Sequence, residues 1–129
     1  MTKLPGAKGL VLYIEDDINI AQMYKFQAEK EGMIFLLASN GQEGIKIARD
    51  QKPDLILLDI LMPELDGWAT LNLLKADSYT KKIPVMILTN LDADLFVKQA
   101  KEAGAVDFLV KAKVTPSQLV KKIKELLKK

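Results

Sequence analysis

The sequence predicts an α/β fold in which a parallel β-sheet lies between two layers of helices. Short apolar runs of strand length alternate with segments of helical periodicity along the whole chain. Three of the five runs are apolar throughout, which is typical of strands buried on both faces of a sheet. The 129 residues suit one domain and contain no evident repeat or linker. We expect an N-terminal tail over residues 1–8 and one folded domain over 9–129.

The predicted strands are five apolar runs of four or five residues. Each run is too short to form a stable helix by itself. They are Leu10–Ile14, Ile34–Ala38, Leu55–Leu58, Val85–Leu88 and Asp107–Val110.

The predicted helices lie between and after these strands, and most show an apolar stripe with a period of three to four residues. Stripe residues include Ile20, Met23, Tyr24, Trp68, Leu71, Leu74, Phe96, Ala100, Ala103, Leu119, Ile123, Leu126 and Leu127. Gly32 and Gly104 stand where helices should end, and Pro53 ends the second helix before a strand.

Helix starts also have signals in the sequence. Thr115-Pro116 combines a capping residue with a proline at the first helical position. Asp17 and Asp92 are candidate caps for the first and fourth helices.

The alternation of strands and helices restricts the topology of the sheet. Right-handed crossovers between parallel strands leave few arrangements. We favour a flavodoxin-like three-layer sandwich with the strand order 2-1-3-4-5. In such sheets ligands bind beyond the carboxyl ends of the strands, at the switch point between the first and third strands.

Composition excludes several kinds of chemistry. The chain has no cysteine and no histidine, so disulfides, thiolate or imidazole metal ligands and a Ser-His-Asp triad are excluded. No apolar run approaches the length of a membrane-spanning helix, and we expect a soluble, cytoplasmic protein without a membrane partner. The net charge of +2 is too small to indicate nucleic-acid binding, and the lysine-rich last helix is better explained as a solvated face.

Polar residues follow four of the predicted strands. The strand order should gather them at one edge of the sheet, although each alone has an ordinary explanation as a cap or surface residue. They are Glu15, Asp16 and Asp17 after the first strand, Asp59 after the third, Thr89 after the fourth and Lys111 after the fifth.

These residue types favour phosphoryl chemistry. Neighbouring carboxylates repel one another, and a divalent cation relieves the repulsion. Oxygen ligands favour Mg²⁺ or Mn²⁺. With lysine and threonine beside the metal, the oxygens of a phosphoryl group could be held, and a central carboxylate could act as nucleophile. Asp59 is the best candidate nucleophile because its strand should be central. Asp17 is better explained as a helix cap.

The chain resembles the response-regulator receiver domain, the CheY-like family of two-component signalling. The matching stretches are "VLYIEDD", "PDLILLDILMPELDGW", "VMILTN" and "AGAVDFLVKA". The run D-x-x-M-P-x-x-D-G, from Asp59 to Gly67, is the most specific of them. The resemblance implies that 9–129 is a receiver domain.

The resemblance also implies roles for the residues at the strand ends. Asp59 would be the phosphoacceptor, and Asp16 would bind Mg²⁺ directly. Glu15 would act mainly through metal-bound water, and the backbone carbonyl of Leu61 would be a further ligand.

The remaining implied roles concern signalling. Thr89 and Lys111 would bind the phosphoryl group, and Thr89 would move with Phe108, the aromatic switch residue. The movement would alter the face formed by the last two helices and the last strand. The donor would be a phosphohistidine on a sensor histidine kinase or phosphotransfer protein. Output would come from a downstream protein or from homodimer formation, and the domain would catalyse only its own phosphorylation and dephosphorylation.

Three departures from the family pattern stand out. Ala112 follows Lys111 where the family usually has proline with a cis peptide, so either a trans bond with a changed loop or a strained cis bond is expected. Asn90 replaces a small residue and should narrow access to Asp59. Leu61 and Leu91 are apolar where polar side chains tune hydrolysis, which predicts slow decay of the phosphorylated state.

Three other functions were weighed. The main alternative is a receiver-like interaction module that works without phosphorylation. Asn90 and the absence of the proline allow it, whereas the site residues argue against it, since all are intact: Glu15, Asp16, Asp59, Thr89 and Lys111. A hydrolase with an aspartate nucleophile lacks an evident second acid or base. A dinucleotide-binding domain lacks its phosphate loop, because "GAKGL" precedes the first strand.

Overall fold

Five parallel strands form one sheet in the order β2-β1-β3-β4-β5. The strands are β1 Leu10–Ile14, β2 Ile34–Ala38, β3 Leu55–Leu58, β4 Val85–Thr89 and β5 Asp107–Val110. The computed structural model describes residues 9–62, 66–91 and 93–128, so the predicted tail over 1–8 lies outside the described residues. The predicted strand order is confirmed. Four strands have the predicted bounds, and β4 continues one residue further, to Thr89.

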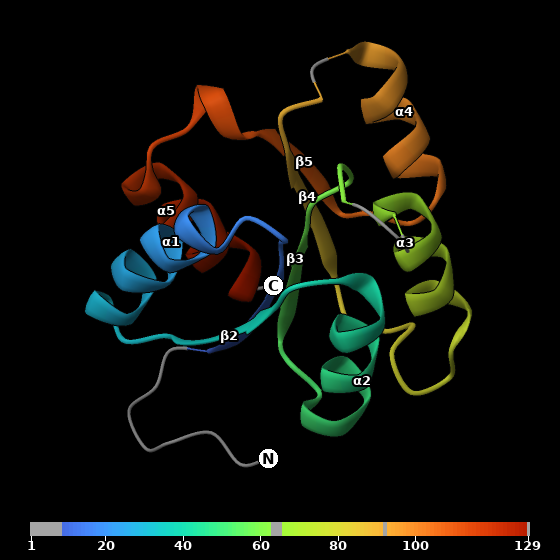
Figure 1. Ribbon diagram of the computed structural model, residues 1–129, viewed down its shortest axis with the longest axis horizontal. Helices are drawn as coiled ribbons and strands as arrows, with labels where there is room; N and C mark the ends of the chain where they lie inside the picture. Colours follow the sequence, from blue (N-terminus) through green and yellow to red (C-terminus); the bar gives the residue numbers. More distant parts are fainter. Residues whose placement is uncertain (1–8, 63–65, 92, 129) are drawn as a thin grey trace.

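Helices cover both faces of this sheet and make it the middle of three layers. Figure 1 shows α1 and α5 on one face and α2, α3 and α4 on the other. The helices are α1 Ile18–Lys30, α2 Gly41–Gln51, α3 Gly67–Ala76, α4 Asp94–Glu102, the short 3₁₀ helix η1 Lys111–Lys113 and α5 Pro116–Leu127. No helix in the described ranges is long and apolar enough to cross a membrane.

Alternate strand residues point to opposite faces and form two hydrophobic cores. Val11 and Tyr13 of β1 pack in the core under α1 and α5. Leu12 and Ile14 of the same strand pack in the core under α2, α3 and α4. Full burial of one such side chain contributes roughly 1.5–3 kcal/mol, so the apolar central strands hold the sheet firmly in place.

Two of the three helix caps that the sequence indicates are confirmed. Asp17 caps α1 by accepting bonds from two backbone amides, as predicted. Thr115 and Gln118 form a reciprocal capping box at α5. The residue before α4 is Ala93, which provides no side-chain cap; Asp92, the predicted cap, lies outside the described residues.

Two glycines end helices as predicted. Gly32 follows α1 with φ of 90°, and Gly104 follows α4 with φ of 100°. Residues other than glycine rarely adopt this left-handed backbone, so the chain can turn sharply towards β2 and β5 at these positions.

Candidate functional site

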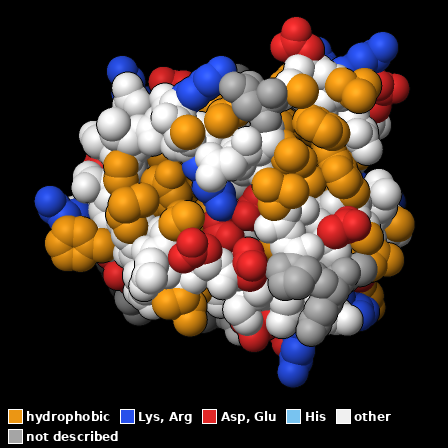
Figure 2. Space-filling view, turned by 45° about the horizontal axis from the view of Figure 1, so that its top comes forward, with side chains coloured by type: hydrophobic (Ala, Val, Ile, Leu, Met, Phe, Trp, Pro, Cys, Tyr) orange, Lys and Arg blue, Asp and Glu red, His pale blue; other side chains and the backbone are white. Residues whose placement is uncertain are grey.

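Three carboxylates lie together at the carboxyl ends of β1 and β3. Glu15 and Asp16 follow β1, Asp59 follows β3, and one oxygen of each lies within 4.8 Å of the others. The register aligns Ile14 with Leu58, so the residues that follow them are neighbours. Figure 2 shows acidic side chains gathered near the middle of one face, with hydrophobic side chains on both sides. The sheet thus brings together the acids that the sequence places far apart.

The three acids differ in exposure. Glu15 and Asp59 are only 2% and 3% exposed, whereas Asp16 is exposed to solvent. Burial raises the pKa of the Glu15 carboxyl, and the negative charge of Asp59 adds to this shift, while a hydrogen bond from Lys111 opposes it. Ionised Glu15 therefore needs a cation nearby.

Lys111 supplies a cation within the protein itself. Its Nζ donates hydrogen bonds to Oε1 of Glu15 and, at 2.9 Å, to Oδ2 of Asp59. Burial lowers the pKa of Lys111, but the bonds to the two carboxylates outweigh this effect and raise its pKa. The ammonium group therefore stays protonated and bridges two of the three acids.

The loop after β5 resolves the alternative left open by Ala112. No peptide bond among the described residues is cis, so the bond between Lys111 and Ala112 is trans. The changed loop forms η1, which starts at Lys111. The lysine nevertheless reaches both carboxylates, so the trans bond does not displace it from the site.

The backbone after β3 fixes the position of Asp59. The backbone amide of Leu61 donates to Oδ1 of Asp59 at 3.1 Å. A Cβ atom on Gly67 would lie 2.3 Å from Cα of Ile60 and 2.4 Å from the carbonyl oxygen of Asp59, so only glycine allows α3 to start this close. Asp66 caps α3 through the amide of Ala69. These contacts explain the D-G end of the motif; residues 63–65 lie outside the described residues.

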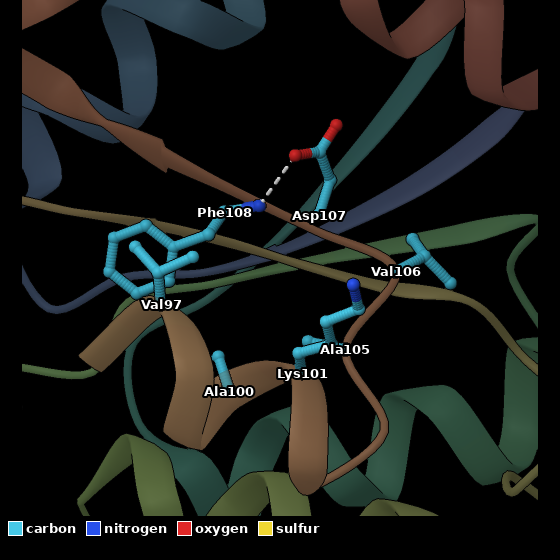
Figure 3. Close-up of a pocket in the computed structure, with 7 residues that line it drawn as sticks. All are labelled: Val97, Ala100, Lys101, Ala105, Val106, Asp107 and Phe108. Carbon is cyan, nitrogen blue, oxygen red and sulfur yellow. Dashed lines mark hydrogen bonds between the residues drawn. The ribbon is translucent and has the colours of Figure 1, made fainter. Parts of the chain in front are cut away.

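Thr89 and Phe108 lie on the neighbouring strands β4 and β5. Thr89 is fully buried at the end of β4, and its Oγ1 accepts a long bond of 3.4 Å from the amide of Leu91. Thr89 pairs with Val110 in the sheet, which places it beside Lys111. Phe108 is half-buried among residues of the second core, and Figure 3 shows its ring beside Val97 of α4.

Tyr13 is a residue of the site that the sequence analysis missed. Its hydroxyl donates to Oε1 of Glu15 at 2.8 Å. Burial and the nearby charge of Glu15 raise the pKa of this hydroxyl, which therefore stays a donor. Residues two apart in a strand share a face, so a tyrosine two positions before a strand-end glutamate is a signal that could have identified the contact.

The acidic cluster fits a hard divalent cation. Its donors are all carboxylate oxygens, which Mg²⁺ and Mn²⁺ prefer. Exposed Asp16 leaves a route for the ion and its water molecules, and the ion would offset the charge of the buried pair. The role of the Leu61 carbonyl as a ligand stays a prediction.

A parallel sheet in the order 2-1-3-4-5 with clustered acids at its switch point defines a CheY-type α/β domain. The model of the response regulator receiver domain family matches residues 11–124. The chain therefore belongs to the receiver domain family of two-component response regulators.

Individual relatives agree with this assignment. The chain is 39% identical over 119 residues to the protein PilH of Pseudomonas aeruginosa, which covers 91% of this chain and 96% of PilH. It is 34% identical to the transcriptional regulatory protein AfsQ1 of Streptomyces coelicolor, covering 78% of this chain but 44% of AfsQ1. The solved Francisella response regulator 1452 receiver domain matches with a TM-score of 0.85 and 30% identity, covering 93% of this chain and 97% of that structure. The chain thus spans nearly all of one relative and under half of another.

Proposed function

We propose that this chain is a single-domain response regulator that accepts a phosphoryl group on Asp59 from a phosphohistidine in a Mg²⁺-dependent phosphorelay. The match to nearly the whole length of PilH supports the single-domain part of the proposal, with 9–129 as the receiver domain. The observation that carries the proposal is the contact of Lys111 with both Glu15 and Asp59. It places a fixed positive charge beside a buried carboxylate.

The transfer uses groups that the site already holds. A carboxylate oxygen of Asp59 bonds to phosphorus while the bond between phosphorus and the donor imidazole nitrogen breaks, and the electron pair stays on that nitrogen. Lys111 and the hydroxyl of Thr89 would bind the phosphoryl oxygens. In this proposal the domain catalyses only its own phosphorylation and its own dephosphorylation, and is not otherwise an enzyme.

Glu15, Asp16, Asp59 and the Leu61 carbonyl would hold the metal. A bound Mg²⁺ would neutralise charge on the carboxylates and on the phosphoryl oxygens. Tyr13 and Lys111 both hold Oε1 of Glu15. Its Oε2 accepts a 3.2 Å bond from the Asp17 amide.

The output surface would be the face formed by α4, β5 and α5. Thr89 of β4 and Phe108 of β5 would connect the site to this face. Phe108 lines a cavity of about 260 Å³ together with Val97 and Ala100 of α4 (Figure 3). A change in the position of its ring would alter the shape of this surface. The partners would be a cytoplasmic sensor kinase or phosphotransfer protein on the input side, and a downstream protein or a second copy of the chain on the output side.

An intact-mass measurement tests the proposal. The chain is incubated with acetyl phosphate and Mg²⁺, and the same is done with Asp59→Asn. We expect the mass of one phosphoryl group to be added to the native chain, only when Mg²⁺ is present, and none to the variant. The absence of this addition from the native chain, with acetyl phosphate and with a phosphorylated histidine donor, would instead favour an interaction module that works without phosphorylation.

A further inference from the structure

The side chain of Asn90 connects the end of β4, where Thr89 lies, to η1, where Lys111 lies. Asn90 follows the last residue of β4, and its Oδ1 accepts a hydrogen bond of 3.2 Å from the backbone amide of Ala112. Thr89 pairs with Val110 in the sheet, so the ends of β4 and β5 lie next to each other. The bond therefore runs from the end of β4 directly to η1.

The bond requires two departures from the usual receiver-domain sequence, Asn90 after Thr89 and Ala112 after Lys111. Asn90 supplies an acceptor where the family usually has a small residue with no polar side-chain atom. Ala112 supplies an amide hydrogen where the family usually has proline, which has none. Each residue alone would be an unexplained replacement, whereas together they form a contact.

The cap and the closing backbone bond of η1 provide little restraint at the end next to Lys111. Val110, the residue before η1, provides no side-chain cap. The backbone bond that closes η1, from the amide of Val114 to the carbonyl of Lys111, is long at 3.3 Å. Asn90, Lys111 and Ala112 also line an open groove beside α1. Val114, which follows η1, packs against the first hydrophobic core. The loop is therefore held at its far end by packing, and the bond to Asn90 lies at the end next to Lys111.

We propose that Asn90 is a positioning residue for Lys111. By holding the amide of Ala112, it fixes the start of η1 and keeps Nζ of Lys111 against Glu15 and Asp59 while the peptide bond is trans. The predicted effect on phosphorylation rests on the proposed function, whereas the predicted effect on the loop does not.

Asn90→Ala is the first test, with two readouts. Amide hydrogen exchange of Ala112 reports on the loop, and the rate constant of phosphorylation by acetyl phosphate at saturating Mg²⁺ reports on Lys111. Loss of one hydrogen bond predicts exchange faster by roughly 3- to 10-fold and a rate constant lower by a similar factor. If Asn90 acted mainly through its bulk, by narrowing access to Asp59, the same variant would be phosphorylated faster.

Asn40→Ala is the matched control. Asn40 makes the same kind of bond as the cap of α2, because its Oδ1 accepts a hydrogen bond of 2.8 Å from the backbone amide of Glu43. The control should lower stability without changing the exchange of Ala112 or the rate constant. A double-mutant cycle adds Ala112→Pro, which removes the amide hydrogen that Asn90 accepts. This substitution should lower the phosphorylation rate constant less in the Asn90→Ala variant than in the native chain, because the variant has already lost the bond.

Each outcome decides the proposal. Unchanged exchange of Ala112 in Asn90→Ala overturns the contact, and faster exchange with an unchanged or higher rate constant overturns the positioning role. Fully additive effects of the two substitutions also contradict it. If the native chain is not phosphorylated, the proposed function fails, while unchanged exchange of Ala112 in Asn90→Ala would still overturn the contact and faster exchange would still support it.

Discussion

Nζ of Lys111 lies 2.9 Å from Oδ2 of Asp59, although 52 positions separate the two residues in the sequence. The same ammonium group also contacts Glu15. The lysine thus lies between two buried carboxylates, at the place where the acidic cluster fits a metal ion. This arrangement implies that a bound metal ion and the Lys111 ammonium group would together neutralise the carboxylates.

Replacement of Lys111 by methionine should destabilise the protein when Mg²⁺ is absent. Two buried carboxylates would lose their partner, and removing one partner of a buried pair costs roughly 3 kcal/mol or more. Urea unfolding measures the loss, and added Mg²⁺ should restore part of it. Lys122→Met is the control, because Lys122 pairs with Asp107 at the surface and its loss should cost less than about 1 kcal/mol. Equal effects of the two substitutions would contradict the bridging role.

Mg²⁺ itself should raise the free energy of unfolding of the native chain. Each tenfold increase of Mg²⁺ above its dissociation constant adds about 1.4 kcal/mol when the ion binds only the folded state. Asp16→Asn should remove most of this gain, and because Asp16 is exposed, it should leave the metal-free fold intact. Thermal unfolding with and without chelator measures both. A variant that keeps the full gain would show that Asp16 is not a ligand.

The raised pKa of Glu15 predicts the pH dependence of the metal-free protein. The folded state binds the Glu15 proton more tightly than the unfolded chain does. The stabilising contribution of Glu15 is therefore complete below the unfolded pKa and is lost as pH rises through the folded pKa. Urea unfolding of the native chain and of Glu15→Gln is measured from below the unfolded pKa of Glu15 to above its folded pKa. As pH increases, the free energy of unfolding of the native chain should fall relative to that of the variant. A shift in favour of the native chain would contradict the assignment.

Tyr13→Phe should lower the free energy of unfolding of the metal-free protein, although the aromatic ring stays in the core. The variant loses the bond to Oε1 of Glu15, and a hydrogen bond to a charged group contributes about 1.5–3 kcal/mol. Tyr24→Phe is the control, because it removes a tyrosine hydroxyl from the same core. The Tyr24 ring packs edge-on against Tyr13, with 6.0 Å between the ring centroids. Unfolding in urea should show a clearly larger loss for Tyr13→Phe, and similar losses would indicate that the hydroxyl of Tyr13 contributes little.

The phosphorylated state should decay slowly. Leu61 and Leu91 follow the ends of β3 and β4 and have no polar atoms with which to orient an attacking water molecule. The decay of the phosphorylated chain after removal of the donor measures the half-life, which should be much longer than seconds at room temperature. Leu61→Asn should shorten it, because the amide side chain can orient the attacking water molecule. The Leu61 side chain is exposed, so we expect the fold to tolerate the change. A native half-life of seconds would contradict this prediction.

The sequence predicts the fold and the gathering of the acids because both follow from short-range patterns. Apolar runs of strand length determine which segments form the sheet, and the carboxyl ends of neighbouring parallel strands then meet. Glu15 and Asp59 lie together for this reason. The extension of β4 to Thr89 was missed because a buried threonine does not continue an apolar run.

Contacts that depend on the close approach of side chains could not be predicted in this way. The steric need for Gly67 depends on how closely α3 approaches Asp59. The outcome at Ala112 was open because the sequence does not show that Asn90 reaches its amide. The bond from Tyr13 to Glu15 is a different case, because the two residues lie two positions apart at the end of one strand and this spacing indicates the contact. It was missed because the tyrosine also fits the apolar run of a buried strand.

Chemical mapping of the phosphorylated residue tests the central claim most directly. The chain is phosphorylated with acetyl phosphate and Mg²⁺ and then reduced with borohydride, which converts an aspartyl phosphate to homoserine, and its peptides are sequenced by mass spectrometry. The account predicts homoserine at position 59 alone, and none when Mg²⁺ is withheld. Homoserine at position 16, or a phosphoryl group on any other residue with Asp59 unmodified, would contradict it.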